Sequence, residues 1–243
     1  QSKVSEVIQL LKQEQYDCLI DLHNNLRSQQ IKLQLSAKSY TFNKINLAKW
    51  LMVRFKINRL PNVHIVERYM ETIKLLSVTN DGKGLDYFIP PEDELDINTV
   101  FVNHKDLSLK NAYIAFVIGA TYATKRLPNE QIIKICQQLS DPIILLGGPK
   151  DKENGTAIAA ASGKHVVNAC GIYNLNQSAS IVRQATKVIS HDTGLMHIAA
   201  AFQQKIISVW GNTIPEFGMY PYYDNNVDKN IIFEQKGLSC RPC

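Results

Sequence analysis

The chain has 243 residues, of which 45% are hydrophobic and 20% charged, and its formal net charge is +5. Nucleic acid is not an expected partner, because the charge excess is small and no alternation of basic and aromatic residues runs along the chain. No stretch approaches the roughly 20 apolar residues of a membrane span. This length favours one large or two modest globular domains, and the mild positive charge fits an anionic ligand or an anionic membrane surface.

Strands and helices alternate along the first half, which predicts an α/β fold with parallel sheets. We expect one buried strand over residues 16–22 and helices over residues 4–11, 26–35, 48–55 and 65–76. The looser stretch from Val78 to about Ser108 contains glycines, a Pro-Pro pair and a run of acids, so it is the best candidate for a domain boundary. We place one domain in residues 1–95 and the other in residues 96–243.

The second half alternates more regularly. We expect strands over residues 113–118, 143–146, 165–169, 188–190 and 206–210, separated by helices over 129–138, 151–161, 177–184 and from 194 onwards. In parallel sheets, ligands collect at the carboxyl ends of the strands. The loops that follow four of these strands are therefore expected to form one binding site: 119–128, 147–151, 171–174 and 191–194.

The segment from Ser190 to Ala201 is the most informative part of the chain. Asp192 and Thr193 are good N-cap residues for the helix that follows. The first turn of that helix would present backbone N–H groups and the positive end of the helix dipole to a phosphate group. Gly194 would let an anion or a sugar approach the backbone closely, and His197 lies one turn further on. An ordinary helix cap is the alternative interpretation.

The other loops contribute polar side chains to the same edge. Thr121 offers a hydroxyl, and Lys125 offers the fixed positive charge that a departing diphosphate needs, with Arg126 beside it. Asp151 would accept hydrogen bonds from ribose hydroxyls or would favour the start of a helix. Tyr173 would lie beside a nucleotide base or pack against the protein.

Cysteine usage gives weaker signals. The odd number of cysteines and the lack of a secretory signal peptide favour a reducing cytoplasm. Cys240 and Cys243 have the spacing of metal ligands or of a disulfide, but a zinc site would need two further ligands and there is no second pair. We therefore expect no bound metal. Because the chain starts at Gln1 and stops immediately after an apparent motif, we expect it to be a fragment of a longer protein.

Several segments together resemble one family, the lipopolysaccharide heptosyltransferases of glycosyltransferase family 9, over nearly the whole chain. The segment Asp192-Thr193-Gly194-Leu195-Met196-His197 looks like the signature of that family. Four further segments are similar to its other motifs: Thr124-Lys125-Arg126-Leu127-Pro128, Gly147-Gly148-Pro149-Lys150-Asp151, Ile20-Asp21-Leu22-His23-Asn24-Asn25-Leu26-Arg27-Ser28 and Cys240-Arg241-Pro242-Cys243.

The resemblance implies a GT-B fold of two Rossmann-like domains with parallel sheets, the N-terminal acceptor-binding domain being incomplete and the C-terminal domain binding the nucleotide sugar. It implies an inverting transfer of heptose from ADP-heptose to the lipopolysaccharide inner core, with no cofactor and no metal. The acceptor would be a lipid-linked saccharide, reached by a cytoplasmic enzyme peripheral to the inner membrane and in contact with its anionic surface. The residues implied to contact the donor are Thr121, Lys125, Asp151, Tyr173, Asp192, Thr193, Gly194 and His197.

One departure from the family pattern concerns the general base. The family carries this aspartate in a glycine-aspartate loop after its first strand, and no such loop precedes Ser2. We expect the base upstream of Gln1, and we expect the 243-residue chain to bind nucleotide sugar but to transfer poorly. Asp21 matches another family position and is expected to order the turn that follows it.

Two alternatives stay open. The same phosphate-binding features would serve a GT-B transferase that uses another nucleotide sugar, and they would also serve a nonenzymatic nucleotide-binding paralogue. A dinucleotide oxidoreductase is disfavoured, because no G-x-G-x-x-G follows any predicted strand.

Overall fold

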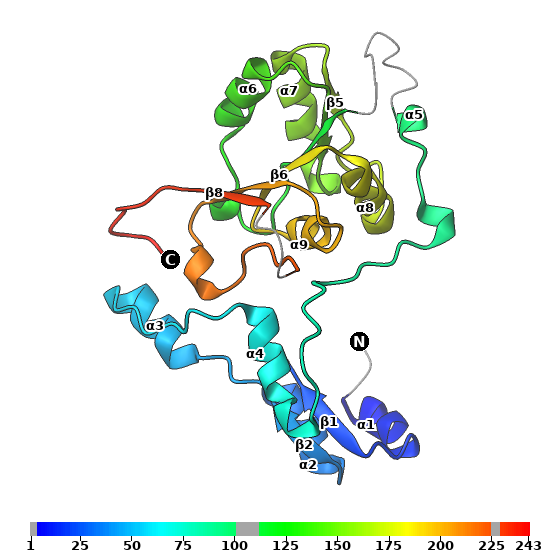
Figure 1. Cartoon of the computed structure of the whole chain (residues 1–243), viewed down its shortest axis with the longest axis vertical. Coiled ribbons are helices and arrows are strands. Elements are labelled where there is room, and N and C mark those ends of the chain that lie inside the picture. Colours follow the sequence, from blue (N-terminus) through cyan, green and yellow to red (C-terminus); the bar gives the residue numbers. More distant parts are fainter. Residues whose placement is uncertain (1–3, 101–111, 225–228) are drawn as a thin grey trace. The chain divides into compact units, whose positions relative to one another are not determined.

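The computed structural model describes residues 4–100, 112–224 and 229–243 (Figure 1). The chain forms two compact units, Gln1–Asp81 and Gly82–Cys243. The division comes earlier than the boundary that we expected after residue 95, because the residues just before 95 are fastened to helix α8 (Leu175–Gln184). Glu94 forms an ion pair of 2.6 Å with Arg183, and the Leu95 amide donates to the Ser180 hydroxyl at 3.0 Å. Part of the looser stretch, residues 101–108, lies outside the described residues.

The N-terminal unit contains a two-stranded parallel sheet in which Ile20 of one strand lies opposite Tyr40 of the other. Its elements in chain order are α1 (Val4–Gln13), β1 (Cys18–Asp21), α2 (Leu26–Gln34), β2 (Lys38–Thr41), α3 (Asn46–Phe55) and α4 (Ile65–Thr72). The four helices and β1 were predicted, whereas β2 was missed. The sequence Lys-Ser-Tyr-Thr of β2 is short and polar, and Tyr40 is the one residue of the strand that is buried.

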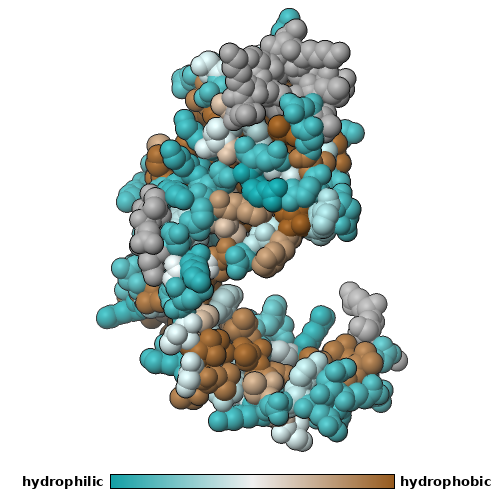
Figure 2. All heavy atoms as spheres, turned by 45° about the vertical axis from the view of Figure 1, so that its right-hand side comes forward, coloured by the Kyte–Doolittle hydropathy of each residue, from teal (hydrophilic) through white to brown (hydrophobic). Residues whose placement is uncertain are grey.

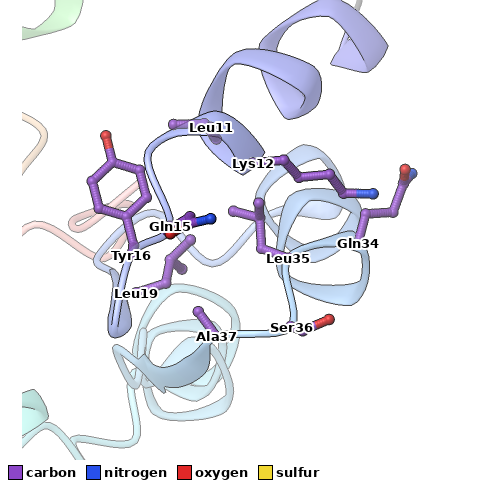
Figure 3. A pocket seen from close by; sticks show the side chains of 9 residues that line it. All are labelled: Leu11, Lys12, Gln15, Tyr16, Leu19, Gln34, Leu35, Ser36 and Ala37. Carbon is purple, nitrogen blue, oxygen red and sulfur yellow. The ribbon is translucent and has the colours of Figure 1, made fainter.

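Asp21 ends β1 and orders the turn after it, as expected. Its carboxylate accepts hydrogen bonds from the Asn24 amide at 2.7 Å and the Ser28 hydroxyl at 2.8 Å, and it pairs with Lys32 at 2.9 Å. Burial alone would raise the pKa of Asp21, but these partners lower it to about 2. At the amino ends of β1 and β2, opposite this turn, lies a pocket of about 460 Å³ that is walled by Leu11, Leu19 and Leu35 among others (Figure 3).

The C-terminal unit contains a six-stranded parallel sheet in the order β5-β4-β3-β6-β7-β8. The strands are β3 (Ile114–Val117), β4 (Ile143–Leu146), β5 (Val166–Asn168), β6 (Lys187–His191), β7 (Ile206–Trp210) and β8 (Asn230–Glu234). The first five were predicted. The edge strand β8 was missed, because its central residues Ile231–Phe233 are all exposed and give no alternation of buried and exposed positions.

Helices cover both faces of this sheet. The helices are α5 (Ile97–Val100), α6 (Asn129–Gln138), α7 (Lys152–Ser162), α8 and α9 (Gly194–Ala201). Apolar residues of α8 and α9 pack with Ala115 and Val117 on one face, whereas residues of α6 and α7 pack with Ile114 and Phe116 on the other. Alternate residues of one strand therefore enter two cores, which is the pattern of a doubly covered parallel sheet. The predicted α/β fold with parallel sheets is confirmed.

The order of the strands also locates a crevice. From β3 the chain continues through β4 and β5 to one side of the sheet, and β6, β7 and β8 follow on the other side. The carboxyl ends of β3 and β6 therefore border the point at which the winding reverses, where ligands bind in sheets of this kind. None of the helices in the described ranges combines the length and the apolar character that crossing a membrane requires.

Candidate functional site

A cavity of about 820 Å³ lies at the carboxyl ends of the strands in the C-terminal unit. Its size is typical of a small-molecule site. The loops after β3, β4, β5 and β6 all contribute to its wall, as the sequence predicted. The lining residues are Val117, Gly119, Ala120, Thr121, Arg126, Gly147, Gly148, Pro149, Lys150, Asp151, Tyr173, Asn174, Leu175, Ser178, Thr193, Gly194 and Leu195.

The start of α9 forms one wall of this cavity. Thr193 is the N-cap residue, with extended backbone (φ −143°), and its carbonyl accepts from the Met196 amide at 3.1 Å. Among the described residues, no backbone amide is capped by the Thr193 side chain, whose hydroxyl lies 3.3 Å from that of Ser190. Thr193 and Gly194 line the cavity, so the positive end of the helix dipole lies at its wall.

The glycines around the cavity differ in what surrounds them. A Cβ at Gly119 would lie 2.5 Å from the Asp151 carboxylate, and one at Gly211 would lie 2.6 Å from the Thr124 carbonyl oxygen. A Cβ at Gly194 would have no atom of the described protein within 4 Å. Packing therefore requires glycine at positions 119 and 211 but leaves open space beside Gly194, on the cavity side of the helix start.

Lys125 and Asp192 form an ion pair beside this helix start. The Lys125 ammonium lies 2.6 Å from the Asp192 carboxylate, and their side chains are only 22% and 8% exposed. The Thr213 hydroxyl donates to the same carboxylate oxygen at 3.0 Å. The structure thus brings the predicted cation to the residue just before the N-cap of α9, so the two features can act on one ligand.

Arg126 links the first and second loops. Its guanidinium forms an ion pair of 2.9 Å with Asp151 and also donates to the Ala120 carbonyl. The Asp151 carboxylate, which is buried, accepts from the Gly148 amide at 2.9 Å. Asp151 is the N-cap of α7, but within the described residues its side chain makes no bond to that helix. Its carboxylate instead turns back to the cavity wall, where it meets Gly148 and Arg126.

The other predicted residues occupy the cavity or its margin. Tyr173 and Thr121 line it, and Tyr173 is half-buried against the core, where burial raises the pKa of its hydroxyl. His197 lies within electrostatic reach of the ion pair: burial lowers its pKa, Asp192 raises it and Lys125 lowers it, and the net shift is downward. Its imidazole is therefore neutral at pH 7.

The sequence did not assign a role to His191, the last residue of β6. Its ring is fully buried, and its Nε2 accepts the Leu127 amide hydrogen at 2.9 Å, which ties the loop of Lys125 and Arg126 to β6. Burial, together with the charge of Arg126, lowers the pKa of His191 to about 4, so the ring stays a neutral acceptor. The usable signal was its place at a strand end, directly before Asp192.

The C-terminal segment holds the loop after β7. Arg241 donates to the Gly211 carbonyl at 2.7 Å and the Thr213 carbonyl at 2.8 Å, and it pairs with Glu234 at 2.8 Å. The Asn212 amide in turn donates to the Thr124 carbonyl at 3.3 Å. The positions of Thr213 and of the Lys125 loop therefore depend on this segment, a role that the sequence did not reveal.

Cys240 and Cys243, on either side of this arginine, are exposed. In the part of the chain that the structure describes, no cluster of three or more His, Cys, Asp or Glu side chains could hold a metal ion.

These features define an α/β protein with a cavity at the carboxyl edge of its sheet, bordered by the start of α9. The sequence pattern of glycosyltransferase family 9 (heptosyltransferase) matches residues 4–241, and the chain belongs to this family. It is 27% identical over 217 residues to lipooligosaccharide heptosyltransferase 2 of Haemophilus influenzae, an alignment that covers 84% of this chain and 63% of that relative. The chain thus spans less than two thirds of the length of this curated relative.

Solved structures show the same fold. The family 9 glycosyltransferase of Veillonella parvula superposes with a TM-score of 0.74 at 22% identity, covering 97% of this chain and 68% of that one. The Escherichia coli ADP-heptose LPS heptosyltransferase II superposes with a TM-score of 0.68 at 20% identity, and the match covers 95% of this chain and 72% of that one. These likenesses confirm the GT-B fold that the motifs implied.

Proposed function

We propose that this chain provides the donor site of an inverting glycosyltransferase that moves heptose from ADP-heptose to the lipopolysaccharide inner core. The observation that carries the proposal is the ion pair of Lys125 with Asp192, directly before the start of α9, whose residues Thr193 and Gly194 line the cavity. Membership of family 9, and the ADP-heptose in the name of the similar E. coli structure, support ADP-heptose as the donor.

In this proposal the diphosphate rests against the first turn of α9. The backbone amides near Gly194 and the Lys125 ammonium donate to its oxygens. Negative charge grows on ADP as the bond to the anomeric carbon breaks, so donors already fixed in place stabilise the transition state more than the ground state. His197, neutral and close to the ion pair, contributes a further hydrogen bond without adding charge.

The second and third loops hold the adenosine part of the donor. Asp151 accepts from the ribose hydroxyls, since each of its carboxylate oxygens keeps acceptor capacity beyond its bonds to Arg126 and the Gly148 amide. Tyr173 and Thr121 contact the nucleotide from the cavity wall. The general base is not one of these donor-site residues. It removes the proton of the acceptor hydroxyl while that oxygen attacks the anomeric carbon from the side opposite the departing ADP.

The acceptor in this proposal is a lipid-linked saccharide at the cytoplasmic face of the inner membrane. Direct displacement inverts the anomeric centre, and Lys125 supplies leaving-group stabilisation without a metal ion.

The test is calorimetric titration of the chain with ADP, UDP and GDP. We expect ADP to bind at least tenfold more tightly than the other two, and we expect Lys125→Met to weaken ADP binding by about 10- to 100-fold, the value of a hydrogen bond to a charged group. Lys164→Met is the matched control, because Lys164 is exposed at the amino end of β5, away from the cavity. Unchanged ADP affinity in Lys125→Met contradicts the proposal. Tighter binding of UDP or GDP than of ADP means that the donor is a sugar linked to that other nucleotide.

A further inference from the structure

The basic residues of this chain are concentrated in one stretch of the N-terminal unit. Residues 22–66 hold none of the 22 acidic residues and eight of the 27 basic ones, so they carry a formal charge of +8 where the whole chain carries +5. The eight are Arg27, Lys32, Lys38, Lys44, Lys49, Arg54, Lys56 and Arg59. A charge excess confined to one segment indicates an anionic partner for that segment.

Helix α3 lies within this stretch and presents large apolar side chains to solvent. Leu47, Trp50 and Val53 are 70%, 54% and 37% exposed, and their spacing of three residues places them on one side of the helix. Phe55 is 54% exposed, and its ring packs edge-on against Trp50 with the centroids 5.2 Å apart. The Arg54 guanidinium lies 5.8 Å from the centroid of the Phe55 ring.

Two further basic residues lie on α3 or directly after it. Burial, followed by the charges of Arg68 and Lys44, lowers the pKa of Lys49 in the first half of α3. Lys56 follows the helix as its left-handed C-cap, and its ammonium donates to the Val53 carbonyl at 2.9 Å. The helix is therefore a short amphipathic segment whose exposed side combines aromatic, aliphatic and basic residues, within a stretch of sequence that holds no acid.

Exposure alone does not distinguish α3. Figure 2 shows apolar residues gathered on the visible face of the N-terminal unit, the lower body in that view. Leu26, Leu33 and Leu75 are 79%, 87% and 81% exposed. Only α3, among the described helices of this unit, combines exposed aromatic side chains with flanking cations inside the acid-free stretch. That combination is typical of segments that lie in the interface of a membrane.

We propose that α3 and the turn after it form a docking surface for an anionic lipid bilayer. Trp50, Leu47 and Val53 enter the level of the headgroups, and the basic side chains, among them Arg54 and Lys56, contact lipid phosphates. The helix has ten residues and is about 15 Å long, so it lies in the interface and does not cross it. The proposal deepens the proposed function, because a lipid-linked acceptor is reached from a membrane surface.

The chain supplies its own reporter for this docking. It has two tryptophans, and Trp210 is only 2% exposed inside the core of the C-terminal unit. A change in tryptophan emission on mixing with vesicles therefore reports Trp50. We expect a blue shift with vesicles of 30% phosphatidylglycerol in phosphatidylcholine, and no shift with phosphatidylcholine alone.

Co-sedimentation with the same vesicles gives the affinity. We expect Trp50→Ser with Phe55→Ser to weaken binding at least tenfold, through loss of apolar contact. The triple variant Lys49→Gln, Arg54→Gln, Lys56→Gln should weaken it by about 100-fold, since each charge near an anionic surface contributes a factor of about five. The matched control removes three exposed lysines of the C-terminal unit, with the substitutions Lys134→Gln, Lys152→Gln and Lys164→Gln.

Two results overturn the docking surface. One is a control variant that loses as much binding as the α3 charge variant, which means that net charge alone is responsible. The other is an aromatic variant that binds as well as the wild type, or an emission spectrum that vesicles leave unchanged. ADP titration of the same proteins separates the two proposals: intact ADP binding with no vesicle binding contradicts docking alone, whereas absent ADP binding contradicts the donor site.

Discussion

Gly194→Ala separates the ligand-binding role of the α9 start from its structural role. The added methyl group would have no atom of the described protein within 4 Å, and Gly194 does not have a positive φ. Alanine is a better helix former than glycine by up to about 1 kcal/mol, and position 194 opens α9. We therefore expect the free energy of unfolding to stay level or rise by up to about 1 kcal/mol, which raises Tm by up to about 3 °C.

Donor binding should change in the opposite direction. A phosphate oxygen that accepts from an amide lies about 2.9 Å from the nitrogen, so a Cβ on the same residue enters the space that the diphosphate needs. Losing one charge-assisted hydrogen bond costs about 1.5–3 kcal/mol, which weakens ADP binding by about 10- to 100-fold.

Thermal unfolding and calorimetric titration with ADP measure both effects on one preparation. Gly119→Ala is the comparison, because its new Cβ would lie 2.5 Å from the Asp151 carboxylate and should lower Tm. If Gly194→Ala binds ADP as tightly as the wild type, the diphosphate does not approach Gly194 and the argument fails. If it lowers Tm as much as Gly119→Ala does, the space beside Gly194 is not open.

Three further predictions concern charges. Burial lowers the pKa of His191 from 6.5 in the unfolded chain to about 4 in the folded protein. Its contribution to the free energy of unfolding is therefore complete above pH 6.5, and about 3 kcal/mol is lost as the pH falls to 4. The free energy of unfolding of His191→Gln, measured in urea, should depend less on pH. The pKa of Asp21 is about 2 in the folded protein, so its carboxylate contributes roughly 2 kcal/mol to the free energy of unfolding above pH 4, and this contribution is lost as the pH falls to 2. The variant Asp21→Asn should lack this pH dependence of stability. In a double-mutant cycle, Lys125→Met and Asp192→Asn should show a coupling of about 1–3 kcal/mol in urea unfolding, and additive effects would contradict the mostly buried ion pair.

The regular part of the fold was predictable because its strands are continuous apolar runs. In β3 and β4 every residue is buried, and strands buried on both faces read as unbroken hydrophobic segments. The two missed strands differ from these: β2 is polar, and β8 has an apolar run of only three residues, Ile231–Phe233, which is exposed at the edge of the sheet. Their pairing depends on neighbours far away in the sequence, which local patterns do not contain.

The candidate site also has a part that the sequence predicts and a part that it does not. Lys125 and Gly194 could be proposed from the sequence, because a cation in one strand-end loop and a glycine at a helix start have a local chemical meaning. The contacts that position them were not found, since Thr213 reaches Asp192 from the loop after β7 and the Arg241 side chain comes from the C-terminal segment. A hydrogen bond to a carbonyl or a carboxylate far along the chain leaves no periodicity and no motif.

The ion pairs of the proposed donor site constrain how a diphosphate would bind there. Lys125 is paired with Asp192, and Arg126 with Asp151, while Lys150 is a third cation and lines the cavity. A diphosphate therefore shares Lys125 with Asp192 and cannot obtain a full unpaired charge from it. In the proposed donor site the balance comes from other groups, which are the backbone amides at the start of α9 and Lys150 of the cavity wall. We therefore expect ADP affinity to depend on access to Gly194 as well as on the charge of Lys125.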